Sequence, residues 1–120
     1  LRSLGQDDSQ YVGQYEGDIR ERDRAYHQGT VWGWLLGPFV LAHFRVYHNP
    51  EVALSYLAPM AHHLNDYGLG TLGEIFDGQP PFAPQGCIAQ AWTVAEVLRA
   101  WHTIHPSGNK HSAQKLTSKE

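Results

Sequence analysis

Apolar residues gather in three long segments of the chain, and polar or glycine-rich stretches separate them. The first segment, residues 30–47, reads TVWGWLLGPFVLAHFRVY and is apolar on nearly every side. This pattern predicts a helix that neighbours bury all round. Gly33, Gly37 and Pro38 oppose helix formation by intrinsic propensity, so we expect tertiary packing to hold the helix. Small residues allow another helix to approach closely, and Pro38 is expected to kink the axis.

The second segment, residues 49–68, carries the signals of an amphipathic helix with one solvent-exposed face. Asn49 suits an N-cap, Pro50 suits the first helical position, and Gly68 suits the end. Pro59 predicts a kink. The apolar face comprises Val52, Tyr56, Leu57, Met60 and Leu64.

The third segment, residues 87–104, restores helical spacing and predicts a mostly buried helix. One stripe comprises Ile88, Ala91, Trp92, Ala95, Leu98 and His102, and it is widened by Val94, Val97 and Trp101.

The remaining stretches show no regular pattern. Residues 5–29 are expected to be mostly loop, and residues 68–86 are too rich in glycine and proline for a regular element. Such a long connection is usually functional. Residues 105–120 are polar and predict a disordered tail after a single domain at residues 1–104.

No segment indicates a sheet, so the predicted fold class is all-α. An alternation of buried helices and amphipathic, half-exposed helices is typical of a two-layer ring of helices, in which the apolar helices form the inner wall. In such a ring the loop with Tyr26, His27 and Gln28 is expected to face the loop with Glu74 and Asp77 across a common mouth.

Composition and charge narrow the classes of partner. With 42% hydrophobic and 18% charged residues the chain is globular, and a net charge of -3 argues against binding nucleic acid. No apolar run approaches the roughly 20 residues of a membrane span. The single cysteine, Cys87, cannot form an internal disulfide, which favours a reducing, cytoplasmic location.

Aromatic residues are abundant, with 4 Trp and 6 Tyr, and several cluster before the first apolar segment. Their flat faces suit the apolar side of a sugar ring, while His27 and Gln28 suit its hydroxyls. We therefore expect a sugar site that includes Tyr26, His27, Gln28 and Trp32. Trp34 is expected in the core. Beside the acidic loop, Gln90 is a further candidate for the site, and Trp92 is expected to brace the loop or to pack structurally.

Two blocks of sequence carry a resemblance to a known family. AYHQGTVWGWLLGPF, residues 25–39, and GEIFDGQPPFAPQGCIAQAWTVAEVLRA, residues 73–100, resemble the C-terminal end of the amylo-alpha-1,6-glucosidase family, the glucosidase half of glycogen debranching enzymes. The resemblance implies a partial (α/α)6 toroid, of which this chain supplies the last few helices of a six-hairpin barrel. Related toroid glycosidases take the general acid from mid-barrel and the general base from the loop before the final inner helix, here GTLGEIFDG.

Inverting glycoside hydrolysis needs two carboxyls about 6.5–9.5 Å apart, one protonated and one ionised. Glu74 is the candidate general base, and Asp77 is the second choice and a candidate ligand of sugar hydroxyls. The alternative is that either residue caps a turn or the last helix. Asp18, Glu21 and Asp23 lie near the expected mouth, but nothing singles out one of them as the acid.

Two functions follow from the sequence. In the first, the chain belongs to a debranching-type α-1,6-glucosidase and is inactive alone, because one carboxylate is half of the acid-base pair. In the second, it is a non-catalytic relative that binds glucan or only self-assembles. Both leave apolar faces open and predict a homo-oligomer or a missing N-terminal half of the barrel.

The histidines do not indicate a metal centre. His62 and His63 are adjacent and point about 100° apart on a helix, which suits chelation poorly. We predict no metal site and no cofactor.

Overall fold

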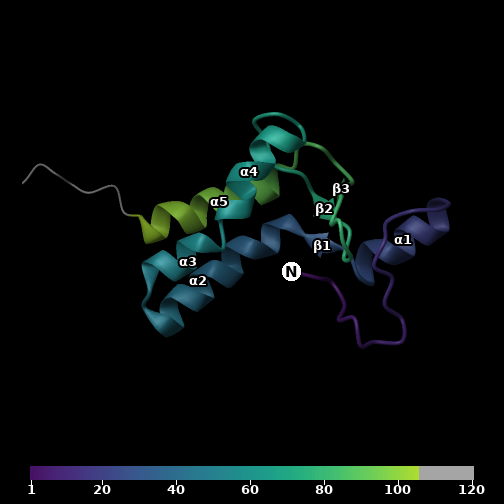
Figure 1. Cartoon of the computed structure of the whole chain (residues 1–120), viewed down its shortest axis with the longest axis horizontal. Helices are drawn as coiled ribbons and strands as arrows, with labels where there is room; N and C mark the ends of the chain where they lie inside the picture. The colour runs from purple at the N-terminus through teal and green to yellow at the C-terminus, as the bar shows by residue number, and fades with distance from the viewer. Residues whose placement is uncertain (106–120) are drawn as a thin grey trace, which may run out of the picture.

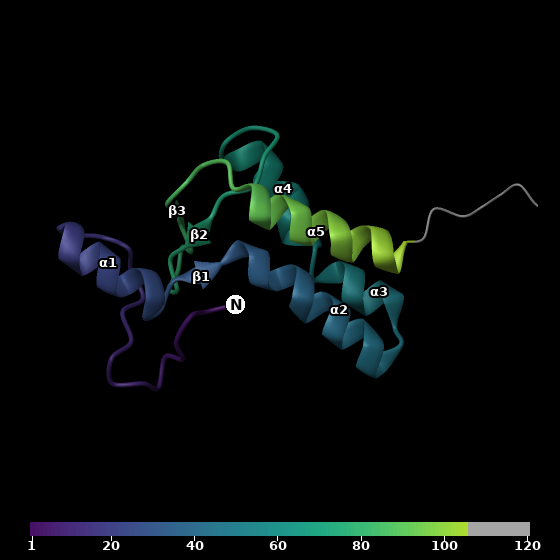
Figure 2. The same cartoon turned by 180° about the vertical axis from the view of Figure 1, so that it is seen from behind.

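The computed structural model describes residues 1–105 and has two parts joined through short strands. In Figures 1 and 2, helices α2 to α5 lie together, whereas α1 and the N-terminal loop lie at the other end, with the strands between them. We call residues 36–66 and 91–105 the helical part, and residues 1–35 and 67–90 the sheet part. The elements in chain order are α1 (Ile19–His27), β1 (Val31–Trp32), the short 3-10 helix η1 (Gly33–Leu35), α2 (Leu36–Tyr47), α3 (Pro50–Ser55), α4 (Ala58–Asp66), β2 (Ile75–Phe76), β3 (Pro84–Gln85) and α5 (Ala91–Ile104).

The helical part is organised around the contact between α2 and α5. Its buried core comprises Val40, Leu41, Ala53, Leu57, Ala100 and Ile104. At one crossing point, a Cβ on Gly37 would lie 2.5 Å from the carbonyl oxygen of Glu96. Only a glycine allows the two backbones to come this close. The prediction that a small residue permits close helix packing is therefore confirmed.

The first apolar segment does not form one continuous helix. Val31 and Trp32 form a strand, and the α-helix begins only at Leu36. Pro38 is the third residue of α2, in the first turn, where backbone N–H groups have no partner within the helix. It therefore does not interrupt α2, and the predicted kink within a longer helix is wrong. Val46 and Tyr47, at the end of α2, are exposed, so α2 is not buried all round within the described residues.

The second apolar segment begins as predicted but divides in two. Asn49 is the N-cap of α3, its side chain accepts a hydrogen bond from the N–H of Val52 at 3.1 Å, and Pro50 is the first helical residue. The chain then breaks between α3 and α4, where Pro59 has no N–H for the carbonyl of Ser55. The kink predicted at Pro59 is thus a separation into two helices.

The segment predicted to be mostly loop contains α1. Asp18 caps this helix by accepting hydrogen bonds from the N–H groups of Arg20 and Glu21, and the Glu21 side chain accepts one from the N–H of Asp18. This reciprocal arrangement is a capping box. The loop prediction was wrong because α1 buries only Ala25 and has no apolar stripe.

The third segment forms α5, which starts at Ala91 and ends at Ile104. Thr93, Ala100 and Ile104 are buried, whereas Trp92 and Leu98 of the expected stripe are 51% and 59% exposed. The prediction that this helix is mostly buried is therefore wrong for the described residues. Within residues 1–105 this apolar face is only partly covered.

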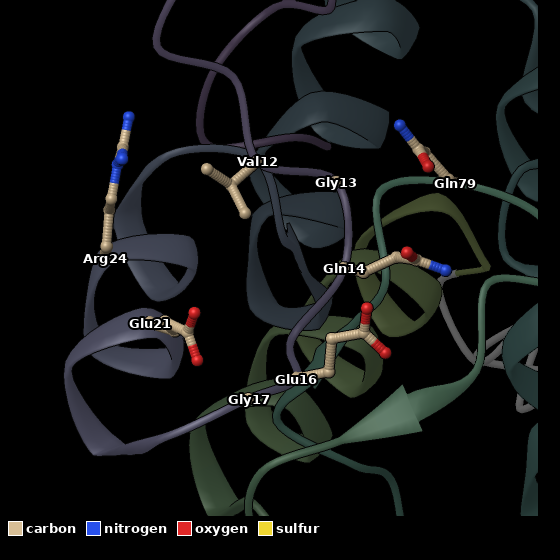
Figure 3. Close-up of a pocket in the computed structure, with 8 residues that line it drawn as sticks. All are labelled: Val12, Gly13, Gln14, Glu16, Gly17, Glu21, Arg24 and Gln79. Carbon is tan, nitrogen blue, oxygen red and sulfur yellow. The ribbon is translucent and has the colours of Figure 1, made fainter.

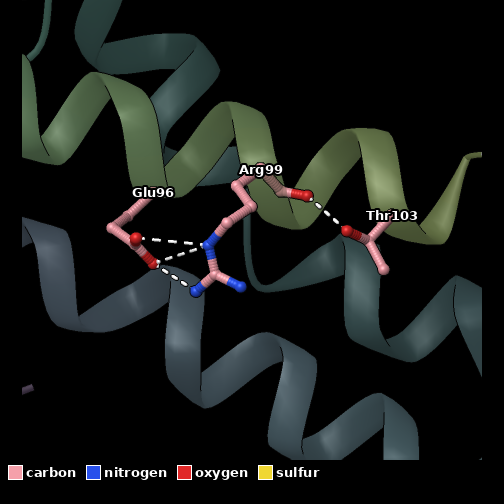
Figure 4. Close-up of polar contacts among 3 residues, drawn as sticks. All are labelled: Glu96, Arg99 and Thr103. Atoms are coloured by element: carbon pink, nitrogen blue, oxygen red, sulfur yellow. Dashed lines mark hydrogen bonds and ion pairs between the residues drawn. The ribbon is translucent and has the colours of Figure 1, made fainter.

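The surface of α5 also carries its polar contacts. Arg99 pairs with Glu96 at 2.5 Å, and the Thr103 hydroxyl donates to the carbonyl of Arg99 at 2.7 Å. Figure 4 shows both contacts. The paired residues are three positions apart on the helix, so they lie on the same face.

The sheet part contains a small antiparallel sheet in the order β1-β2-β3. Val31 pairs with Phe76 and Trp32 with Ile75, and β2 in turn pairs with β3. The all-α prediction therefore needs correction: the chain is a helical domain with a three-stranded sheet. Strands of two residues are too short to show the alternation by which strands are recognised. At the outer edges, Arg2 forms a bridge with Val31, and β3 carries Pro84.

Among the described residues, every helix is too short or too polar to traverse a lipid bilayer. The tail predicted at residues 105–120 lies, apart from His105, outside the described residues.

Candidate active site

Glu74 lies directly before β2 and is held through its main chain from both sides. Its carbonyl accepts a hydrogen bond from the N–H of Gly33 at 3.1 Å, and its N–H donates to the carbonyl of Cys87 at 3.0 Å. The two partners flank it from the β1 and β3 sides of the sheet. The position of Glu74 is therefore fixed by backbone pairing before its side chain makes any contact.

The carboxylate of Glu74 accepts three further hydrogen bonds. Oε1 accepts from the hydroxyl of Tyr26 at 2.5 Å and from Nε2 of Gln90 at 3.3 Å. Oε2 accepts from the backbone N–H of Cys87 at 3.0 Å. An ionised carboxylate has about four acceptor positions. One position therefore remains open for a water or a ligand hydroxyl.

Gly86 makes room for this carboxylate. Its φ of +70° lies in the left-handed region, and a Cβ there would come within 2.6 Å of Oε2 of Glu74. Any other residue would meet both backbone strain and this contact.

Tyr26 is a donor to Glu74 by virtue of its surroundings. Burial, followed by the hydrogen bond to Glu74 and the charge of that carboxylate, raises the pKa of Tyr26 far above its ordinary value of 10.0. Tyr26 therefore keeps its proton at neutral pH and donates it to Oε1.

A cavity of about 290 Å³ lies beside Glu74. It is lined by Tyr15, Ile19, Arg22, Asp23, Tyr26 and Glu74. Its volume is near the lower end of the range for small-molecule sites, which suits a small polar ligand. Of the three acids considered near the mouth, Asp18 and Glu21 form the capping box of α1, and only Asp23 shares this cavity with Glu74.

Asp77 directly follows β2 in the chain and is buried. Its Oδ1 accepts from the N–H of Tyr15 at 2.9 Å, and its Oδ2 accepts from Nε2 of Gln85 at 3.4 Å. Asp77 does not line the Glu74 cavity. These contacts tie the N-terminal loop and β3 to Asp77, and its role as base or sugar ligand stays a prediction.

Of the predicted sugar-site residues, Tyr26 and Gln90 contact Glu74 directly, and Trp32 contacts Tyr26. The indole N–H of Trp32 donates to the carbonyl of Tyr26 at 3.0 Å, and the two rings lie edge to face with centroids 4.5 Å apart. His27 stacks over Trp32 at 6.0 Å and lies at the surface.

Gln28 is not part of this group. Its side chain accepts from Arg24 at 2.8 Å and donates to Gln10 at 3.3 Å. Trp34, expected in the core, is partly exposed and stacks on Trp92 with centroids 4.0 Å apart.

His63 is a residue of the site region that the sequence analysis considered only as a metal ligand. It is buried at the end of α4, and its Nε2 accepts a hydrogen bond from the N–H of Gly73 at 3.1 Å, next to Glu74. Burial lowers the pKa of His63, while Asp66 opposes the shift. Neutral His63 thus links the helical part to the Glu74 loop. Among residues 1–105, no group of three or more His, Cys, Asp or Glu side chains is placed to hold a metal ion.

A second cavity, of about 440 Å³, lies between the N-terminal loop and α1 (Figure 3). It is lined by Val12, Gly13, Gln14, Glu16, Gly17, Glu21, Arg24 and Gln79. It shares no lining residue with the Glu74 cavity, and of the residues considered for the site it contains only Glu21. The candidate active site is therefore the Glu74 cavity.

The sequence of the chain matches a known protein family over most of its length. A sequence model of the family described as amylo-alpha-1,6-glucosidase matches residues 1–99, which include the whole Glu74 group. No curated protein and no solved structure gives a significant match. The match spans most of the chain, and we conclude that the chain belongs to the amylo-alpha-1,6-glucosidase family.

Proposed function

We propose that the chain supplies the general-base side of an α-1,6-glucosidase that releases branch-point glucosyl residues from glycogen or a related α-glucan with inversion. Glu74 is the base. The observation that carries this proposal is the set of three donors on its carboxylate, with one acceptor position left open beside a small cavity.

The chemistry follows from this arrangement. The three donors orient the carboxylate of Glu74, and a carboxylate is the group that removes a proton from water in this reaction. A water bound at the open position would pass its proton to Glu74 as its oxygen attacks the anomeric carbon. Tyr26, Gln90 and Cys87 hold the carboxylate still during this step. Asp77 remains the second choice for the base.

The general acid is proposed to come from outside this chain. Inversion needs a protonated carboxyl about 6.5–9.5 Å from the base, on the leaving-group side. Asp23 shares the Glu74 cavity but lies on the exposed side of α1. We propose that the helices form the last part of an (α/α)6 toroid, and that the acid lies in its upstream part. The partly uncovered apolar face of α5 supports this arrangement.

The test is release of glucose from an α-1,6-linked glucosyl stub. We expect none from the chain alone and restored release when the upstream half of a family barrel is added. Glu74→Gln should abolish the restored activity. Glu96→Gln is the matched control, because Glu96 pairs with Arg99 on α5 and lies outside the cavity. Release by the chain alone, or activity that survives Glu74→Gln, would contradict the proposal.

The second candidate function is a non-catalytic, glucan-binding or self-assembling relative. The exposed Trp92 and Trp101 on α5 favour it, because exposed aromatic faces suit sugars or another copy of the chain. Light scattering with and without malto-oligosaccharide separates these alternatives. Glucan binding without hydrolysis in the complemented assay would favour this candidate.

A further inference from the structure

His63 is a buried titratable residue whose side chain takes no part in the proposed reaction. It is 7% exposed, and its Nε2 accepts a hydrogen bond from the backbone N–H of Gly73 at 3.1 Å. The imidazole packs against two aromatic rings, stacked with Tyr67 at 5.7 Å and edge to face with Phe76 of β2 at 5.0 Å between centroids. This packing holds the ring in the orientation that directs Nε2 at Gly73.

Gly73 is buried between two anchored residues of the candidate active site. Before it, the carbonyl of Leu72 accepts a hydrogen bond from the N–H of Gln90 at 2.9 Å. After it, Glu74 is paired through its main chain, and the Gln90 side chain donates to Oε1 of Glu74. A Cβ on Gly73 would lie 3.3 Å from Nε2 of His63, so this segment packs closely on the imidazole. A movement of Gly73 therefore displaces the main chain that carries Glu74.

Only the neutral form of His63 can accept this hydrogen bond. A neutral imidazole has one acceptor nitrogen, whereas both nitrogens of the imidazolium are donors. Rotation of the ring therefore cannot supply a new acceptor to Gly73 after protonation. The buried N–H of Gly73 would then face a second N–H, and a buried donor without an acceptor is unfavourable. The segment has to move until water reaches this N–H.

The surroundings of His63 keep it neutral at neutral pH. Burial lowers the pKa of His63 below its ordinary 6.5, and the charge of Asp66 on the same helix opposes the shift. From the loop after α4 and from β2, the groups that face the imidazole are the rings of Tyr67 and Phe76. The carboxylate of Glu74 is held by the three donors described above. Protonation of His63 therefore begins in weak acid, below pH 6.5.

We propose that His63 is a positioning residue for the Glu74 base, and that protonation of its Nε2 in weak acid releases Gly73 and displaces the Glu74 carboxylate. The consequence for hydrolysis rests on the proposed function, whereas the coupling of His63 to the Glu74 segment does not. The core cluster of the helical part contains no titratable side chain, so this proton acts on the site and not on that core.

NMR of the 120-residue chain, titrated from about pH 7.5 to about pH 5.5, tests the coupling. The amides of Gly73 and Cys87 should shift together with the imidazole of His63, because Cys87 donates its N–H to Oε2 of Glu74. His63→Gln keeps an acceptor that does not titrate, so both amides should then stay unshifted. His62→Gln is the matched control, because His62 is the exposed neighbour on the same helix, and it should follow the unsubstituted chain.

Three results in this titration overturn the inference. One is that the amides of Gly73 and Cys87 stay fixed while His63 titrates. Another is that their shift persists in His63→Gln, since it then has a different source. The third is that the signals of core residues such as Leu41 are lost over the same range, which means unfolding of the whole chain and not release of one segment.

The complemented glucose-release assay measures the consequence for hydrolysis. The acidic limb of the kcat profile should move to lower pH in His63→Gln and stay in place in His62→Gln. Identical acidic limbs in His63→Gln and the unsubstituted chain overturn the positioning role. The proposed function is judged separately by Glu74→Gln. Activity that survives Glu74→Gln overturns the assignment of the base, whereas the NMR coupling is measured in the chain alone and stands or falls without it.

Discussion

The helical part and the sheet part are held together in different ways. The helical part buries a contiguous apolar cluster in which α2 and α5 make the main contact. The sheet part buries few large apolar side chains and is instead fastened by directed bonds, such as Gly78 N–H to the carbonyl of Gly13 at 2.7 Å and Val12 N–H to that of Gln28 at 2.7 Å. Apolar burial has no direction, whereas hydrogen bonds require geometry. The candidate active site lies in the sheet part, where hydrogen bonds fix the positions of its residues.

The largest effect is expected from removing apolar volume in the helical part. Leu41→Ala deletes a side chain that is 5% exposed and should lower the free energy of unfolding by about 2–5 kcal/mol. Leu98→Ala, at an exposed position on α5, should change it by less than about 0.5 kcal/mol. Urea unfolding followed by circular dichroism measures both. Equal losses would mean that the apolar cluster is not what stabilises this part.

A glycine in the sheet part gives the corresponding test of close packing. A Cβ on Gly29 would lie 2.0 Å from the carbonyl oxygen of Val12, so Gly29→Ala should destabilise by about 1–3 kcal/mol and loosen the N-terminal loop. Gly5→Ala is the control, because a Cβ there meets nothing within 4 Å. Limited proteolysis of residues 1–18 reports on the loop. Equal cleavage rates in the two variants would contradict the role of this contact.

Helix caps allow the same interaction to be compared in both parts. Asp18→Ala and Asn49→Ala each remove an N-cap and should each lower stability by about 1 kcal/mol. Only Asp18→Ala is expected to disturb Tyr26, which lies in the last turn of α1. Hydrogen exchange at α1 and α3 locates the two losses. Asp18→Asn retains an acceptor and should restore slow exchange in α1.

The mildest effect is expected from pH, through the residue that joins the two parts. Because the pKa of folded His63 lies below its ordinary 6.5, the unfolded chain binds the proton more tightly. The stability that His63 contributes is present above pH 6.5 and declines as pH falls below it. His63→Gln keeps an acceptor for Gly73 and should show a flatter decline, whereas His62→Gln, at an exposed position, should follow the unsubstituted chain. Unfolding curves at pH 7.5, 6.5 and 5.5 measure this difference.

The helical part was largely predictable because its signals are local. Asn49 and Pro50 mark the start of α3, and the spacing of apolar residues locates α2 and α5. The sequence alone did not reveal which face of α5 is buried, since Trp92 and Leu98 suggest burial as strongly as Ala100 does. The buried face of α5 is the one that packs on α2.

The sequence predicted side chains of the candidate site but not the main-chain groups that contact them. Tyr26, Gln90 and Glu74 were identified as residues of one site, and the structure brings them together. The backbone N–H of Cys87 and the link from His63 were not predicted, because main-chain donors have no residue type that identifies them. Likewise, α1 was missed although the Asp18 and Glu21 spacing of a capping box was present.

The edges of the three-stranded sheet bear on how copies of this chain associate at high concentration. The outer side of β1 is occupied by the bridge between Arg2 and Val31, and β3 contains Pro84, which has no N–H to offer an incoming strand. Strand addition is therefore disfavoured at both edges. Edge-to-edge growth of this sheet into fibrils is disfavoured for the same reason.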